Sequence, residues 1–195
     1  EKLYTHSSDA DEDFTFIYSD LYEVFIPKNS LVNEAGAIYT GKYKVAPIKA
    51  VEGKTNAQFF TADRDQKLLD IAAICGIEIT ETQSNKPLFL NQKIAFRYNL
   101  KNTPNHSLQV YNYTDTSERV QSLTNVSIES GKLKFETQSL GKLILANAVA
   151  YKEADGKILA DGKIFPFCSF QTSNNLQIAF HSRGTLNGDF RIYIP

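Results

Sequence analysis

Short apolar segments, separated by polar or glycine-containing turns, fill this chain from residue 94 to its end. Eight follow one another, at 94–100, 107–113, 126–130, 132–137, 142–151, 163–170, 175–182 and 189–195. Within them apolar and polar residues tend to alternate, which is the pattern of a half-buried β-strand. Long segments with helical periodicity, which would separate the strands of an α/β fold, do not lie between them. The sequence therefore predicts an all-β fold, specifically an antiparallel β-sandwich.

The charges of the chain are unevenly distributed. The 195 residues include 21 basic and 22 acidic ones, and a net charge of −1 argues against nucleic acid as a partner. Residues 1–23 carry seven acidic residues and one lysine, whereas the remainder carries 15 acidic and 20 basic residues. We expect residues 1–13 to form a flexible acidic leader. Its alternating aspartates lack the glycine and distal glutamate of a calcium loop, so we expect no metal there.

The stretch Tyr22–Ala50 is the most distinctive part of the sequence. An apolar run ends at Pro27, a loop contains Gly36 and Gly41, and alternation then resumes. Proline cannot donate to a strand ladder, so Pro27 should close the first strand. The sequence predicts a corner here, at which two strands of a sandwich reverse or change sheets.

These residues resemble the pattern "IP-x-N-A/S-L/F-V … G … TG-x-V" of extracellular β-sandwich domains in bacterial surface proteins. Those domains are similar to the spectrin-binding sandwich domain of ankyrins, netrin receptors and tight-junction proteins. The resemblance is carried by spaced segments, namely Phe25–Asn33, Gly36, Thr40–Gly41, Val45, Lys67–Leu69, Ile77–Thr80, Asn85–Asn99, Leu108–Tyr113 and Phe135–Gly141. The glycine usual after Asn91 is absent, and Ile74 and Cys75 stand where a methionine is usual.

The resemblance implies a sandwich domain over residues 14–146, an extracellular setting and no catalytic residues. Residues 147–195 lie beyond it, and we expect them to add strands to the same sandwich or to form a small second β-unit. Between residues 63 and 80 a helical pattern in the sequence disagrees with the resemblance, which implies a short turn followed by a strand. We expect one helical turn over 63–70 and a strand from Ala72 to Thr80, because isoleucines dominate the second half.

Two cysteines and one His-Ser pair are the candidate reactive groups. Cys75 and Cys168 both lie in apolar, strand-like settings, so they either form one disulfide in an oxidising compartment or remain buried thiols. His181 and Ser182 follow a predicted strand and could form half of a nucleophile pair in a hydrolytic or self-processing domain. A histidine beside a serine at a strand end is more typical of a solvated turn. We expect no catalytic residues, no cofactor and no metal.

Tyrosines are the candidate binding residues. The chain has no Trp but 10 Tyr, and Tyr98, Tyr111 and Tyr113 fall on neighbouring predicted strands. If they shared an exposed face, their rings could stack on a sugar. Cross-strand aromatic pairs that stabilise the sheet are the alternative interpretation. Apolar terminal strands such as Phe190–Ile194 could also pair with the edge of a second copy.

The leading hypothesis is a non-enzymatic structural or binding module that contacts protein or glycan through loops or sheet edges. No run of 18 apolar residues occurs, so no membrane-spanning segment is expected. The chain has no Met, and we expect a trimmed product from which a signal segment has been removed. With the resemblance, we expect a secreted or cell-surface location, in the periplasm or on the exterior of a Gram-negative bacterium.

Overall fold

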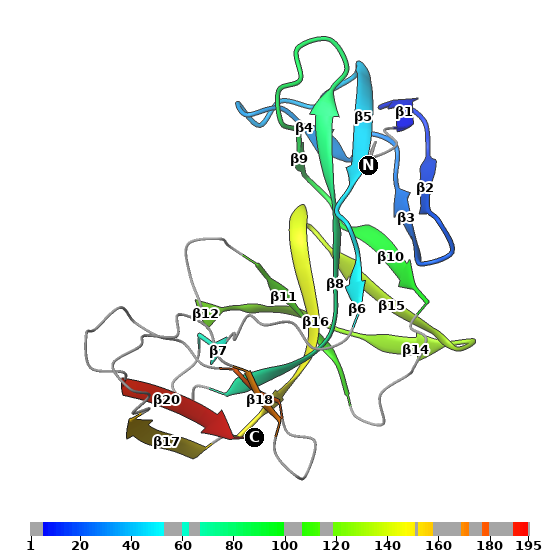
Figure 1. The fold of residues 1–195 in the computed structure, drawn as a ribbon. Coiled ribbons are helices and arrows are strands. Elements are labelled where there is room, and N and C mark those ends of the chain that lie inside the picture. Colours follow the sequence, from blue (N-terminus) through cyan, green and yellow to red (C-terminus); the bar gives the residue numbers. More distant parts are fainter. Residues whose placement is uncertain are drawn as a thin grey trace.

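The computed structural model describes residues 6–52, 60–62, 67–99, 107–113, 119–150, 152–157, 169–171, 177–179 and 189–194. Throughout these residues the regular structure is β-strand. Two sheets pack face to face over one core, which confirms the predicted β-sandwich (Figure 1). No helix in this part of the chain is long and apolar enough to cross a membrane.

The larger sheet, sheet A, is centred on two long neighbouring strands. Its strand order is β1-β5-β8-β16-β11-β13, and its main pairs are antiparallel. These strands are β1 (His6–Asp9), β5 (Lys42–Pro47), β8 (Leu68–Glu81), β16 (Gly141–Val149), β11 (Gln109–Asn112) and β13 (Ser122–Asn125). Three short strands attach beside this path, and two of them, β7 and β12, pair in parallel. They are β6 (Val51–Glu52), β7 (Phe60–Thr61) and β12 (Arg119–Val120).

The second sheet, sheet B, has five antiparallel strands in the order β14-β15-β10-β3-β2. They are β14 (Ser127–Glu129), β15 (Lys132–Thr137), β10 (Ile94–Tyr98), β3 (Tyr22–Ile26) and β2 (Phe14–Tyr18). Three further pairs stand outside both sheets. They are β4 (Leu31–Val32) with β9 (Phe89–Leu90), β17 (Lys152–Lys157) with β20 (Asp189–Ile194), and β18 (Ser169–Gln171) with β19 (Gln177–Ala179).

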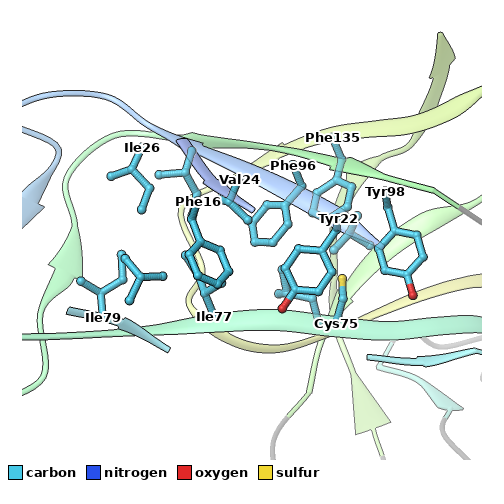
Figure 2. Packing of buried hydrophobic residues seen from close by; sticks show 14 of the residues in the cluster. Phe16, Tyr22, Val24, Ile26, Cys75, Ile77, Ile79, Phe96, Tyr98 and Phe135 are labelled. Atoms are coloured by element: carbon cyan, nitrogen blue, oxygen red, sulfur yellow. The ribbon is translucent and has the colours of Figure 1, made fainter. Parts of the chain in front are cut away.

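In β3, β10 and β15 of sheet B, buried side chains alternate with more exposed ones, and the buried ones contribute to the core. Phe16, Val24, Phe96 and Phe135 are successive cross-strand partners, and each is almost completely buried. Figure 2 shows the four side chains projecting from sheet B toward β8 of sheet A. The rings of Phe96 and Phe135 stack with centroids 4.8 Å apart. Burial of one such side chain contributes about 1.5–3 kcal/mol, so this row is a main source of stability.

A β-bulge in β8 divides the odd-numbered apolar residues of that strand between two clusters on opposite faces of sheet A. Leu145 of β16 is opposite Ala73, but the next residue, Ala146, is opposite Ile71, so Ala72 is the extra residue. A bulge interrupts the two-residue alternation of side chains. Ala73 therefore faces the main core, whereas Ile71 packs with Ala146 in a second cluster on the other face of sheet A.

The N-terminal segment departs from the predicted flexible leader over 1–13. Its residues 6–9 form β1 and pair with β5, and Ala10 is buried. The carbonyl of Ala10 accepts the N–H of Asn29 at 2.7 Å, and Asp9 lies 3.6 Å from the ammonium of Lys42. The acidic composition of residues 1–13 predicted a solvated, flexible segment. In the structure, residues 6–9 pair with β5 and the small side chain of Ala10 fits into the core.

Two further predicted boundaries, the start of a strand at Ala72 and the end of the sandwich domain at 146, differ from the structure. Both fall within the long β8–β16 pair. β8 begins at Leu68 rather than at Ala72, and β16 continues to Val149, beyond the expected domain end at 146. Leu68 and Val149 are direct partners in this ladder. The pairing of two long strands therefore overrides the weak helical pattern near residue 68. The remainder of the predicted turn, at 63–66, lies outside the described residues.

The stretch Tyr22–Ala50 is the predicted corner. It begins in β3 of sheet B and ends just after β5 of sheet A, so the chain changes sheets within it. The side chain of Asn33 accepts the N–H groups of Ala35 and Ala37, both at 3.0 Å, and Gly36 has φ of +78°. This asparagine-centred turn, with glycine in the left-handed region, reverses the chain.

Candidate functional site

The three tyrosines predicted to form a sugar platform do not share an exposed face. Tyr98 is 0% exposed and lies in sheet B, where its ring stacks on Tyr22 with centroids 5.9 Å apart. Tyr111 is 1% exposed and belongs to the second cluster, on sheet A. Buried rings cannot stack on a sugar, so the predicted platform is wrong for both residues. The sequence placed these tyrosines on neighbouring strands but could not say which face of which sheet each one joins.

Tyr113, the third predicted residue, follows β11 and is partly buried against the second cluster. The ammonium of Lys142 lies 4.7 Å from the centre of its ring, and the N–H of Tyr113 donates to the carbonyl of Lys142 at 3.1 Å. A cation over the ring face is a favourable contact that also occupies the face a sugar would need. Tyr113 therefore acts in local packing.

Cys75 lies in the middle of β8 and faces the main core, beside Tyr22 (Figure 2). Among the described residues it is a free thiol and is completely buried. Burial raises the pKa of this thiol well above its usual value, because the thiolate would be desolvated. It is therefore unsuited to nucleophilic chemistry. Cys168 lies outside the described residues, so the predicted disulfide stays a prediction.

The remaining candidate groups divide by location. His181 and Ser182 lie outside the described residues, and their pairing stays a prediction. The aspartates near the N-terminus are separated: Asp9 is on β1 beside Lys42, and Asp13 accepts the N–H of Lys28 at 2.8 Å. Within the described ranges, no group of three His, Cys, Asp or Glu residues could hold a metal ion.

A polar contact inside the core links the two sheets. The hydroxyl of Tyr22 in β3 donates to the carbonyl of Gly76 in β8 at 2.7 Å, and lies 3.1 Å from the carbonyl of Ile48. Burial raises the pKa of this hydroxyl well above its usual value, with the nearby Cys75 adding to the effect. Glycine is required at 76, because φ is +145° and a Cβ would lie 1.9 Å from the carbonyl oxygen of Gly141. A glycine inside an apolar strand was the signal for this close approach.

The solvent face of sheet B is the first candidate interaction surface. Ile17 of β2 and Phe25 of β3 are 59% and 42% exposed, and they are diagonal neighbours across the β2–β3 ladder. Beside them, Glu23 lies 3.3 Å from Arg97 and 3.7 Å from Lys132. We call Ile17 and Phe25 the sheet B patch. The ion pairs restrain the charged side chains next to it and leave its two apolar side chains accessible.

A second apolar surface lies where β4 pairs with β9. Val32 is opposite Phe89 in that pair and opposite Ile38 in an isolated bridge. Directly opposed residues project from the same face, so the three side chains form a row. Ile38 is 59% and Phe89 47% exposed, whereas Leu31 on the other face is buried in the core. We call Ile38, Val32 and Phe89 the end patch.

Sequence patterns did not locate these two patches. Phe25 and Phe89 sit in apolar runs whose neighbours are buried or partly buried, and only the register shows which member of each run faces solvent. No protein-family model, no curated protein and no solved structure matches this chain. The exposed surfaces of the sandwich are therefore the basis for a functional assignment.

Proposed function

We propose that this chain is a non-enzymatic binding module, secreted or exposed at a cell surface, that contacts a protein partner. One observation supports it most directly: large apolar side chains are exposed at positions held by β-pairing. In the described part of the chain the exposed ones are Ile17, Phe25, Ile38, Phe89, Leu123 and Ile128. Four of the six belong to the sheet B patch or the end patch. Single exposed apolar residues are normal, but clusters of them on a folded domain are typical of interaction sites.

The chemistry of the patches favours protein over glycan. Their side chains are aliphatic or phenylalanine, which carry no hydroxyl or indole N–H to bond a sugar. Two of the three tyrosines that motivated the glycan alternative are buried. The resemblance to extracellular sandwich domains supports a location in the periplasm or on the exterior of a bacterium.

Selection of random peptides displayed on phage against the purified chain tests this proposal. We expect enriched peptides whose affinity falls by about tenfold or more in Phe25→Ser or in Phe89→Ser. Leu123→Ser is the matched control, because Leu123 is exposed but lies outside both patches. Thermal unfolding of each variant checks that the fold is retained. Selection that enriches no peptide, combined with binding on a glycan array, would overturn the proposal.

The hydrolytic alternative has its own test, because His181 and Ser182 are outside the described residues. Intact-mass measurement of the stored protein should show one uncleaved chain. A break between Phe180 and Ser182 that disappears in His181→Ala would replace the binding role with self-processing.

A further inference from the structure

β2 is the terminal strand of sheet B, and in the described part of the chain it pairs along one edge, with β3. Its register with β3 is continuous from Phe14 opposite Ile26 to Tyr18 opposite Tyr22. Within the described residues, no strand pairs with its other side. A regular strand with one unpaired side presents a row of backbone donors and acceptors that an added strand can use.

The direction of these backbone groups follows from the turn after β2. The carbonyl of Tyr18 points toward β3, because it accepts the N–H of Leu21 at 3.2 Å. Backbone groups of successive residues in a strand point to opposite sides. The N–H and C=O groups of Thr15 and Ile17 therefore point to the free edge, and those of Phe14, Phe16 and Tyr18 point to β3.

This edge lacks the features that protect other sheet edges from pairing. β2 reads Phe-Thr-Phe-Ile-Tyr, with no charge, proline, glycine or bulge. The other terminal strand of sheet B, β14, has three residues and carries Glu129, which pairs with Lys134. The terminal strand β13 of sheet A is irregular, since its register with β11 shifts between Val110 and Tyr111. Charges and bulges of this kind discourage strand addition, and β2 has neither.

On the solvent face of sheet B, the surface next to the free edge of β2 is apolar. Ile17 lies on β2 itself and Phe25 on the adjacent strand, and both are exposed. On the opposite face of β2, which is turned toward the core, Phe14 and Tyr18 are only partly buried. An added strand would place alternate side chains against these two surfaces, so a partner with apolar residues at alternate positions fits.

Acidic residues stand at both ends of β2. Asp11, Glu12 and Asp13 precede it and Asp20 follows it, all exposed. In a second copy paired antiparallel about Phe16, Glu12 of one chain would face Asp20 of the other. Like charges directly opposite each other are destabilising. The charges therefore disfavour self-pairing and favour a partner whose strand is flanked by lysine or arginine.

We propose that the free edge of β2 takes up an extended segment of another protein, with alternating apolar residues and basic flanks, as an added strand of sheet B. This inference rests on the proposed binding role and specifies the partner class. Backbone hydrogen bonds to Thr15 and Ile17 supply register, contact with Ile17 and Phe25 supplies apolar burial, and the acidic ends select the flanking charges.

Two synthetic peptides and the full chain test the inference. One peptide reads Lys-Lys-Val-Thr-Val-Thr-Val-Lys-Lys, and the other has glutamate in place of each lysine. Fluorescence anisotropy should show that the lysine peptide binds about tenfold or more tightly than the glutamate peptide. The difference should shrink when the ionic strength rises from about 0.05 to 0.5 M, because exposed charges are screened.

Two variants separate the edge from the charges. Thr15→Pro removes an N–H that points to the free edge and leaves the β2–β3 ladder its hydrogen bonds, so the sheet should persist while peptide binding is lost. The double variant Glu12→Lys with Asp20→Lys should reverse the preference and bind the glutamate peptide more tightly. Far-ultraviolet circular dichroism and thermal unfolding confirm that each variant is folded.

Three outcomes would overturn the inference. Equal binding of both peptides would exclude charge selection, and unchanged binding by folded Thr15→Pro would exclude the β2 edge. A wild-type dimer in sedimentation velocity that Thr15→Pro abolishes would assign the edge to a second copy. If peptides enriched by display still bind Thr15→Pro at full affinity, the proposed binding role stands and only this edge assignment fails.

Discussion

The hydroxyl of Tyr22 donates a hydrogen bond to the carbonyl oxygen of Gly76 at 2.7 Å, across the interior of the sandwich. Tyr22 lies in sheet B and Gly76 in sheet A, so this hydrogen bond links the two sheets across the core. The same carbonyl accepts the N–H of Ile48 at 2.9 Å. Three segments that are distant in sequence therefore meet at one peptide group. Figure 2 shows the tyrosine oxygen directed at the strand that carries Cys75 and Ile77.

Tyr22→Phe should lower the free energy of unfolding by about 1–2 kcal/mol, because it removes a buried hydrogen bond while keeping the ring. Urea titration measures the change. Tyr39→Phe is the control: its hydroxyl donates to the carbonyl of Lys42 at 2.8 Å in an exposed position. We expect that variant to lose less than about 0.5 kcal/mol. Equal losses in the two variants would show that the inter-sheet contact has no special weight.

Gly76→Ala should destabilise the protein by about 3 kcal/mol or more, since the new Cβ collides with the backbone of Gly141 and φ is unfavourable. Gly131→Ala is the control that measures the cost of the backbone conformation without a collision. Gly131 has φ of +76°, and a Cβ added there would meet no other atom within 4 Å. The free energy of unfolding of Gly131→Ala should fall by only about 1 kcal/mol. Thermal unfolding of the two variants separates collision from backbone strain, and similar midpoints would contradict the close approach of β8 and β16.

Phe96→Ala should cost about 3–5 kcal/mol, because it removes a fully buried ring from the aromatic row of sheet B. Phe25→Ala, one strand away on the solvent face, should change the free energy of unfolding by less than about 1 kcal/mol. Guanidinium titration of this pair tests the register. If Phe25→Ala proves as destabilising as Phe96→Ala, the two faces of sheet B are wrongly assigned.

Stability should decrease as the pH rises above about 8.5, the ordinary pKa of a cysteine in an unfolded chain. Burial raises the pKa of Cys75, so above that pH the unfolded thiol loses its proton while the folded thiol keeps it. The unfolded state is then favoured by up to about 1.4 kcal/mol per pH unit. Cys75→Ala should flatten this dependence when urea titrations at pH 7, 9 and 10 are compared.

Alkylation examines the same thiol independently. Iodoacetamide at pH 8 should leave Cys75 unmodified in the native protein and modify it in urea without reductant. Mass spectrometry of the digested chain reports both. A Cys75 that reacts in urea only after reduction would instead demonstrate the disulfide to Cys168 predicted from sequence.

Sequence patterns predicted the class of the fold well and the surfaces poorly. Alternation predicted strands at β10 and β15, and Pro27 marked the end of β3. Every odd-numbered residue from Leu69 to Ile79 is apolar, as if one face were buried throughout. The bulge at Ala72 divides that face between two clusters, and it arises from pairing with β16, more than 60 residues away. Local periodicity contains no information on such a partner.

By itself, the sequence determined that this chain forms short antiparallel strands, because alternating apolar residues can be buried only on one face of a sheet. It also marked the end of β3, through Pro27, and the turn that contains Gly36. Tertiary structure decided which buried face each residue joins, why residues 6–10 belong to the sandwich, and why Tyr98 and Tyr111 are inaccessible. Among the described strands, it also left β2 with one unpaired edge. Those outcomes depend on register and on contacts between distant strands, and neither can be read from neighbouring residues.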